Sequence, residues 1–312
     1  MKRVTFQHVD STNEAAKRLM RSHPGERLLV AAHEQRAGKG RLGRSWLSPR
    51  GGVWMTIVQP TGSGEDGRDG AARGPALTET VSLLAGLAVY RGIAAVCFGS
   101  GSEAFEAGLR IKWPNDVWLD GRKVAGVLCE RTAAGCGCGC GCEKGERAGS
   151  GACHEAVLVG IGVNADFDDA ELTRSGESMR ATPTTLRSAL DRRVDVLELE
   201  GSIAEAFVSL ADGGGLEDDG SLVETVRSEI EGRLALLGER AWFGVGERRE
   251  HGVVVGLDGG GRLILECEGG ERAVGAGEVD RVRGASGSGV AVEGATNEDE
   301  GRASRAMMEN AK

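Results

Sequence analysis

The sequence predicts a protein of mixed helices and strands that ends in a small module built only from strands. Residues 77–96 form a long apolar run typical of a buried helix, and strand-like segments stand on both sides of it. From about Arg233 the pattern changes to short alternating strands between glycine-rich turns, which is typical of a small β-barrel. The expected barrel strands cover residues 233–238, 248–258, 261–269 and 271–282.

The length of the chain allows a larger domain beside this module. With 312 residues, 40% of them hydrophobic, the core can form without disulfide staples. We expect the larger domain over residues 1–232, the barrel over residues 233–283 and a disordered tail over residues 284–312. Residues 61–74 and 133–152 have the composition of insertions into the larger domain.

The charge balance excludes some classes of function. A formal net charge of -9 argues against a general nucleic-acid binder, so the clustered Lys39, Arg41 and Arg44 form a local cationic site on an acidic protein. We find no apolar leader at the N-terminus and no apolar run that we judge long enough to span a bilayer. We therefore expect a soluble, cytoplasmic protein that binds no membrane.

The first elements of the larger domain are short. Residues 5–9 read as a strand, and a helix follows that begins at Ser11, with Glu14 in the spacing of a capping box. Residues 27–32 read as a second strand that leads into the cationic loop.

Strands resume after the long helix. Residues 110–119 and 121–131 are expected to pair as a hairpin with its turn at Asp120 and Gly121, and residues 155–166 form a strand apolar enough to be buried on both faces. Mixed helices are expected over residues 186–232.

One of the two insertions is rich in cysteine. Residues 135–142 read GCGCGCGC and hold four of the eight cysteines. Zinc sites usually have pairs spaced C-x2-C, so this C-x-C spacing favours a flexible insertion, with a metal clip as the alternative.

The cationic loop, AGKGRLGRSW over residues 37–46, nearly fits two phosphate-binding patterns. Both patterns require a helix directly after the last glycine, because the free N–H groups at its start hold the phosphate. Here Pro49 and the pair Gly51-Gly52 occupy that place, and residues 53–58 then read as a strand. The loop must therefore bind its anion in another way.

Five segments resemble, in order and spacing, the catalytic domain of biotin protein ligases, also called biotin–acetyl-CoA-carboxylase ligases. They are DSTNEAAK, HEQRAGKGRLGRSWLSPRGGVWMT, IKWPNDV, GRKVAGVLCE and VGIGVNAD. The stretch GVVVGLDGGGRLIL resembles the family's small C-terminal domain. Family members that also repress transcription carry a DNA-binding domain before DSTN, which begins here at Asp10, so the resemblance implies the monofunctional type that binds no DNA.

The resemblance implies a fold and a reaction. The fold is α+β, a mixed sheet with packed helices like that of class II aminoacyl-tRNA synthetases and biotin ligases, followed by an SH3-like β-barrel. The reaction joins biotin and ATP into biotinyl-5′-AMP and then transfers biotin to a lysine of a biotin carboxyl carrier protein. The first step brings several negative charges together, so positioning and preorganised positive charge dominate its catalysis.

The resemblance also assigns residues. The catalytic set is Lys123, Arg41 and Lys39, and the family more often has Arg at position 39, where Lys keeps the charge but loses the planar fork. Mg2+ is assigned to Asp116, which is also a candidate partner of the incoming lysine. The biotin-binding residues are Ser11, Thr12, Asn13, Gln35, Lys39, Gly40, Arg41 and Lys123, and the nucleotide-binding residues are Gly38, Arg44, Trp46, Lys112, Asn115 and Asn164.

Several of these residues have a purely structural interpretation. Ser11 stabilises a helix start by about 1 kcal/mol without any ligand, Lys123 alone would be a solvated hairpin lysine, and Pro114 favours a plain turn. Two rival functions remain: a lipoyl or octanoyl transferase of related fold, and a non-catalytic nucleotide- or metal-binding protein. A homodimer through the sheet edge is compatible with the resemblance.

Overall fold

The computed structural model of the chain describes residues 1–61, 76–134, 154–173, 182–245, 248–275 and 283–284. The expected insertions and the expected C-terminal tail fall almost entirely outside the described residues, as does the whole Gly-Cys tract.

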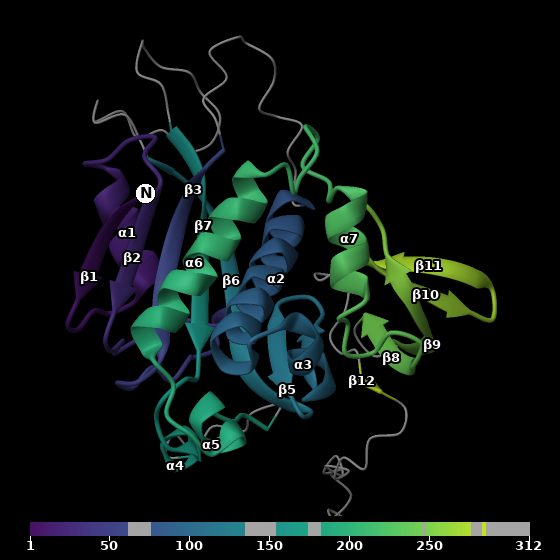
Figure 1. Ribbon diagram of the computed structural model, residues 1–312. Helices are drawn as coiled ribbons and strands as arrows, with labels where there is room; N and C mark the ends of the chain where they lie inside the picture. Colours follow the sequence, from purple (N-terminus) through teal and green to yellow (C-terminus); the bar gives the residue numbers. More distant parts are fainter. Residues whose placement is uncertain (62–75, 135–153, 174–181, 246–247, 276–282, 285–312) are drawn as a thin grey trace, which may run out of the picture.

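A mixed seven-stranded sheet forms the centre of the larger domain (Figure 1). The strand order is β1-β2-β3-β7-β6-β5-β4, in which β1 and β2 are parallel and every other neighbouring pair is antiparallel. The predicted mixed sheet is confirmed. The strands are β1 (Lys2–Phe6), β2 (Leu28–Ala32), β3 (Val53–Pro60), β4 (Leu109–Lys112), β5 (Asp116–Leu119), β6 (Arg122–Ala134) and β7 (His154–Val163).

Helices cover both faces of this sheet. Alternate side chains of β2 enter two different hydrophobic clusters, because successive residues of a strand point to opposite faces. Leu28 and Val30 pack with α1 (Thr12–Met20), whereas Leu29 and Ala31 pack with α2 (Ala76–Phe98) and α6 (Val196–Asp212). The shorter helices are α3 (Gly101–Glu106), α4 (Asp169–Thr173), α5 (Leu186–Leu190) and α7 (Glu224–Glu231).

The long helix α2 is apolar on all sides because it is enclosed by α6, α3 and the sheet. The expectation that no apolar run is long enough to span a bilayer is therefore wrong for this helix. By length and composition alone Leu77–Phe98 would qualify, but 78% of its most apolar window is buried inside the protein. This helix therefore belongs to the core.

The hairpin between β5 and β6 is confirmed at the predicted turn. Asp120 and Gly121 have φ of 47° and 70°, the positive values that a two-residue hairpin turn requires. The segment expected as one strand over residues 110–119 is divided into β4 and β5 by a turn at Pro114. The first strand lies a little earlier than predicted, at Lys2–Phe6, because Val9 already belongs to the turn that contacts Gln35.

The C-terminal module is a five-stranded antiparallel sheet of order β11-β10-β9-β8-β12. Residues 233–238, expected as its first strand, instead connect the two sheets, and the Arg233 carbonyl accepts from the Ile111 N–H of β4 at 2.8 Å. Leu234 is buried there, which explains the apolar pattern of this segment. The strands are β8 (Arg240–Val245), β9 (Arg248–Leu257), β10 (Leu263–Cys267), β11 (Gly270–Val274) and β12 (Arg283–Gly284).

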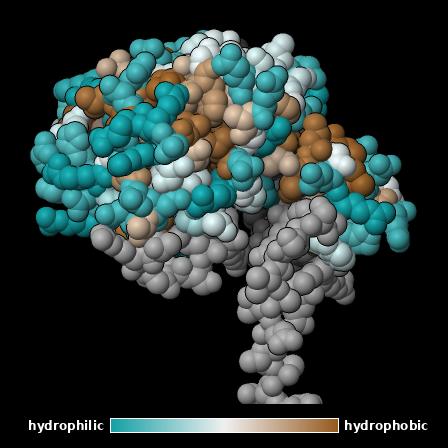
Figure 2. Space-filling view, turned by 60° about the horizontal axis from the view of Figure 1, so that its bottom comes forward, coloured by the Kyte–Doolittle hydropathy of each residue, from teal (hydrophilic) through white to brown (hydrophobic). Residues whose placement is uncertain are grey.

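The two sheets contact each other through one continuous hydrophobic core. A hydrogen bond adds to this contact, since the Trp113 indole of the larger domain donates to the Gly261 carbonyl at 2.9 Å. The outer side of the small sheet keeps Trp242 and Val255 partly exposed. Seen from below, hydrophobic side chains gather on the main body and toward the small module on the right (Figure 2).

Candidate active site

The floor of the candidate site is a patch of glycine on the sheet face that also carries α1. Gly126 of β6 and Gly162 of β7 are direct neighbours in register. A Cβ at Gly162 would come within 2.7 Å of the Trp46 indole nitrogen, and one at Gly126 within 3.0 Å of the same ring. Only glycine therefore lets a flat group lie directly on these two strands.

The start of α1 forms one wall of the site. Ser11, Thr12 and Asn13 are all buried there. The N–H and the hydroxyl of Thr12 both donate to Gln35 Oε1, at 2.8 and 3.1 Å. Thr56 of β3 places its hydroxyl 2.6 Å from Asn13 Oδ1, so a closed polar network joins helix, loop and sheet. The predicted biotin-binding residues of this wall are thus brought together.

The predicted capping box is wrong in its side-chain contacts. Ser11 stands at the N-cap of α1, but its side chain makes no capping hydrogen bond. Glu14 turns outward instead, and its carboxylate accepts from Lys39 Nζ at 2.6 Å and from Lys17 Nζ at 3.1 Å. The two ammonium groups, Lys39 first and Lys17 second, lower the pKa of Glu14. Glu14 therefore pairs with the two lysines and does not cap the helix.

The cationic loop is followed by a strand, as the sequence predicts, and the loop itself is a hairpin. Its arms are joined by hydrogen bonds from the Gly40 N–H to the Arg44 carbonyl at 2.7 Å and from the Trp46 N–H to the Gly38 carbonyl at 2.9 Å. A Cβ at Gly38 would lie 2.6 Å from Ser48 Oγ, so this position requires glycine. No helix follows the loop, since β3 begins at Val53.

The tip of the loop reaches the turn between β4 and β5. Arg41 donates to Asn115 Oδ1 at 3.1 Å, and the Asn115 amide donates to the Val127 carbonyl of β6 at 2.7 Å. Arg44, which was assigned to the nucleotide, donates to the carbonyl of Arg41 within its own loop at 3.1 Å. The loop therefore crosses the site from α1 to the far strands.

Lys123 lies at the centre of the arrangement. Its Nζ is 2.7 Å from Asp116 Oδ1 and 5.0 Å from the centre of the Trp46 ring. Both partners of the ion pair are about one fifth exposed, at 22% and 21%, so a ligand can still reach them. The backbone of Lys123 is fixed on both sides, because its N–H donates to the Thr182 carbonyl and its carbonyl accepts from the Thr184 N–H.

Two more predicted nucleotide residues lie on the same face. Lys112 stands opposite Asp116 in register, and burial lowers the pKa of Lys112 to about 8 although Asp116 opposes the shift. Asn164 is only 2% exposed and donates to the Thr184 carbonyl at 3.1 Å. The hydrogen bonds of the described residues leave Asn164 Oδ1 without a partner. The proposed contacts of both residues with a nucleotide stay predictions.

The structure adds polar residues that the sequence analysis did not select. Glu130 of β6 accepts from the Asn13 amide at 2.7 Å and from Lys17 Nζ at 3.3 Å. Thr56 and Ser48 complete the network around Gln35 and Asn13. For Thr56 the available signal was a single polar residue among the apolar residues 53–58, whereas Glu130 stands beside Arg131 and Thr132 and gave no such signal.

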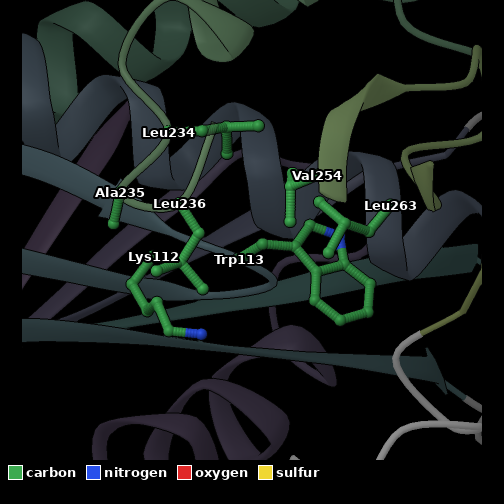
Figure 3. Close-up of a pocket in the computed structure, with 7 residues that line it drawn as sticks. All are labelled: Lys112, Trp113, Leu234, Ala235, Leu236, Val254 and Leu263. Atoms are coloured by element: carbon green, nitrogen blue, oxygen red, sulfur yellow. The ribbon is translucent and has the colours of Figure 1, made fainter. Parts of the chain in front are cut away.

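A crevice between the two sheets is a separate feature. Its volume of about 10 Å³ is at the lower limit for one water molecule, so it cannot hold biotin or a nucleotide. In Figure 3 Lys112 and Trp113 line it on the side of the larger domain. It is lined by Lys112, Trp113, Leu234, Ala235, Leu236, Val254 and Leu263.

Comparison with known proteins defines the class. Residues 5–141 match the Biotin/lipoate A/B protein ligase family, and residues 246–282 match the Biotin protein ligase C terminal domain. A biotin protein ligase from Aquifex aeolicus in complex with biotin and ATP has the same fold, with a TM-score of 0.60 and 23% identity over 91% of this chain and 99% of its own. One from Leishmania major in complex with biotinyl-5-AMP gives a TM-score of 0.52 and 22% identity over 88% and 99%.

A relative of known name is similar over most of both chains. The Biotin--[acetyl-CoA-carboxylase] ligase of Paracoccus denitrificans is 33% identical over 272 residues, which cover 86% of this chain and 96% of that protein. The chain therefore belongs to the biotin protein ligase family.

Proposed function

We propose that the chain activates biotin with ATP and transfers it to a lysine of a biotin carboxyl carrier protein. In the first step a carboxylate oxygen of biotin attacks the α-phosphorus, the bond to the bridging oxygen breaks, and pyrophosphate leaves with the electron pair. In the second step a lysine amine attacks the acyl carbon, loses a proton and displaces AMP. Biotin thereby becomes an amide of the carrier.

One observation carries this proposal: Lys123 and the Trp46 ring of the cationic loop lie over a floor of glycine, and Arg41 at the tip of the loop reaches Asn115 beside it. A flat ligand can approach the backbone of Gly126 and Gly162, and Trp46, which now covers these glycines, would have to move aside or stack on it. Lys123 and Arg41 supply positive charge where the carboxylate meets the α-phosphate, which is where the transition state gathers negative charge.

Biotin recognition fits the wall at the start of α1. The ureido ring of biotin is neutral and needs fixed neutral donors and acceptors. Thr12, Asn13 and Gln35 provide these groups. Thr12 donates to Gln35, and Asn13 is held by Thr56 and Glu130, so all three are in place before any ligand arrives.

Magnesium fits the site only as a companion of ATP. No group of three or more His, Cys, Asp or Glu side chains able to hold a metal occurs among the described residues. Nucleotide sites commonly hold Mg2+ with one or two carboxylates and the phosphates themselves, so the single carboxylate of Asp116 is sufficient. Bound there, the ion would neutralise the charge of the phosphates.

The compartment proposed for this reaction is the cytoplasm. The three cysteines that the structure describes, Cys97, Cys129 and Cys267, are all free thiols. Free thiols are the rule in the reducing interior of the cell.

The direct test is biotin-dependent exchange of labelled pyrophosphate into ATP, with Lys123→Ala as the variant. We expect exchange by the wild type and a loss of at least about tenfold in the variant, which is about 1.4 kcal/mol of transition-state stabilisation. Lys123→Arg, which keeps the charge, should fall between the two.

The same assay separates the rival functions. Exchange that depends on added lipoate or octanoate and not on biotin would favour a lipoyl or octanoyl transferase that activates its acid with ATP. The absence of turnover with all three acids would favour a binding protein. Exchange at the wild-type rate in Lys123→Ala would remove the central role of that residue.

A further inference from the structure

The cationic loop is held to α1 by one ion pair that the proposed chemistry does not use. Lys39 Nζ lies 2.6 Å from Glu14 Oε1, although the lysine side chain is 48% exposed. Lys39 stands in the first arm of the loop hairpin, opposite Ser45 of the second arm. The pair therefore ties the hairpin itself to the first turn of the helix.

The surroundings of Glu14 favour this pair. Lys17 of the same helix lies 3.1 Å from the same carboxylate oxygen and 3.3 Å from Glu130 of β6. Two carboxylates and two ammonium groups thus alternate from the sheet through α1 to the loop, in the order Glu130, Lys17, Glu14, Lys39. The charges balance within this row, so each ammonium has a carboxylate beside it.

Few apolar contacts hold the outer part of the loop. None of the residues Arg41–Gly43 at its tip is buried, and Leu42 is 81% exposed with a left-handed φ of 58°. The base of the loop is anchored by the Ala37 N–H, which donates to the Asp10 carbonyl at 2.9 Å. Farther out, the pairs Lys39–Glu14 and Arg41–Asn115 and the Trp46 ring contact the rest of the protein. A segment with so little buried apolar surface opens easily, so single polar contacts can set its open fraction.

From these contacts we infer that Glu14 is a positioning residue, which keeps the loop over the glycine floor through its ion pair with Lys39. Lys39 then acts through the loop and does not touch the reacting atoms. To reach a phosphate it would have to leave Glu14, which would remain beside the site as an extra negative charge. Arg41 and Lys123 remain the cations that face the ligand.

The kinetic test of this inference, by pyrophosphate exchange, rests on the proposed function, whereas the structural test, by trypsin cleavage, does not. Trypsin cleavage after Arg41, followed by mass spectrometry, measures how often the loop of the ligand-free protein opens. Glu14→Gln and Lys39→Gln should each raise this cleavage rate about threefold, which is in the range for a half-exposed ion pair. The double variant should be no faster than either single variant, because both remove the same contact.

The charge-swapped variant Glu14→Lys with Lys39→Glu separates attraction from side-chain identity. It should recover most of the protection that either reversal alone loses. Arg18→Gln is the matched control, since it breaks the bidentate pair of α1 with the Asp10 carboxylate, whereas the loop contacts Asp10 through its backbone carbonyl, which the substitution leaves in place. Its cleavage rate should equal that of the wild type.

In pyrophosphate exchange, a loop that is open more often should raise the KM for biotin about threefold in Glu14→Gln and in Lys39→Gln, with kcat changed by less than about twofold. The inference is overturned if Lys39→Gln lowers kcat tenfold while Glu14→Gln has no effect, since Lys39 would then act on the reacting atoms. Equal trypsin cleavage in wild type and Glu14→Gln, or faster cleavage in Arg18→Gln, would also overturn it. A wild type without exchange would refute the proposed function and leave the cleavage result to decide the role of Glu14.

Discussion

The two faces of the central sheet differ in the size of the side chains that the same strands place on them. Along β7, Val157, Val159 and Ile161 are buried against the side of α2. Gly160 and Gly162, the residues between and beside them, face α1 and the cationic loop. One face is packed for stability, and the other gives up side-chain volume so that a ligand can lie on the backbone. This division explains why a strand that reads as almost wholly apolar still carries a site.

The largest effect should come from the packed face. Ile161→Ala removes a buried side chain from the core, so we expect a loss of about 3 kcal/mol in the free energy of unfolding. Urea denaturation measures this loss. The folded variant should keep its pyrophosphate exchange rate at low temperature, and a loss of activity without a loss of stability would contradict the division between the faces.

The neighbouring residue should behave in the opposite way. Gly162→Val fills the floor at the place where the Trp46 ring now lies, so exchange should fall about 100-fold, equivalent to about 2.7 kcal/mol. Its stability should change by less than about 1 kcal/mol, because Trp46 belongs to a loop that can shift. Gly201→Val, on α6 with no heavy atom near its Cβ direction, is a control for activity. An active Gly162→Val would show that the ligand binds elsewhere.

The smallest effect concerns pH and Lys112. Burial lowers the pKa of Lys112 to about 8, so its ammonium is charged below that pH and becomes neutral as the pH rises through it. If this charge binds phosphate, the KM for ATP should rise about threefold between pH 7 and pH 9. Lys112→Arg stays charged, so its KM should not rise over the same range. An identical rise in both proteins would assign the titration to another group.

Much of the fold was predictable because its signals are local. The run over residues 77–96 is too apolar and too long for anything but a buried helix or a membrane span, and Asp120-Gly121 accepts the positive φ of a tight turn. The strand at Arg240–Val245 was missed because Leu234 and its neighbours look more strand-like, although they pack between the two sheets. A local pattern cannot tell which partner buries an apolar segment.

The site was predictable to the extent that a motif marks it. The resemblance selected Lys123, Asp116, Arg41 and Gln35, and the structure brings them to one face of the sheet. It could not supply the contact between Glu14 and Lys39, which are 25 positions apart and meet only because the loop folds back on α1. For the same reason Glu14 was interpreted as part of a local cap.

The most direct test of the account is a crystal structure of the chain with biotin and a non-hydrolysable ATP analogue. We expect biotin on the backbone of Gly126 and Gly162, its carboxylate beside Lys123 Nζ, and the Trp46 ring displaced from the glycines. Ligand bound outside that face, with Trp46 still on the glycines and Lys123 still paired only with Asp116, would contradict it.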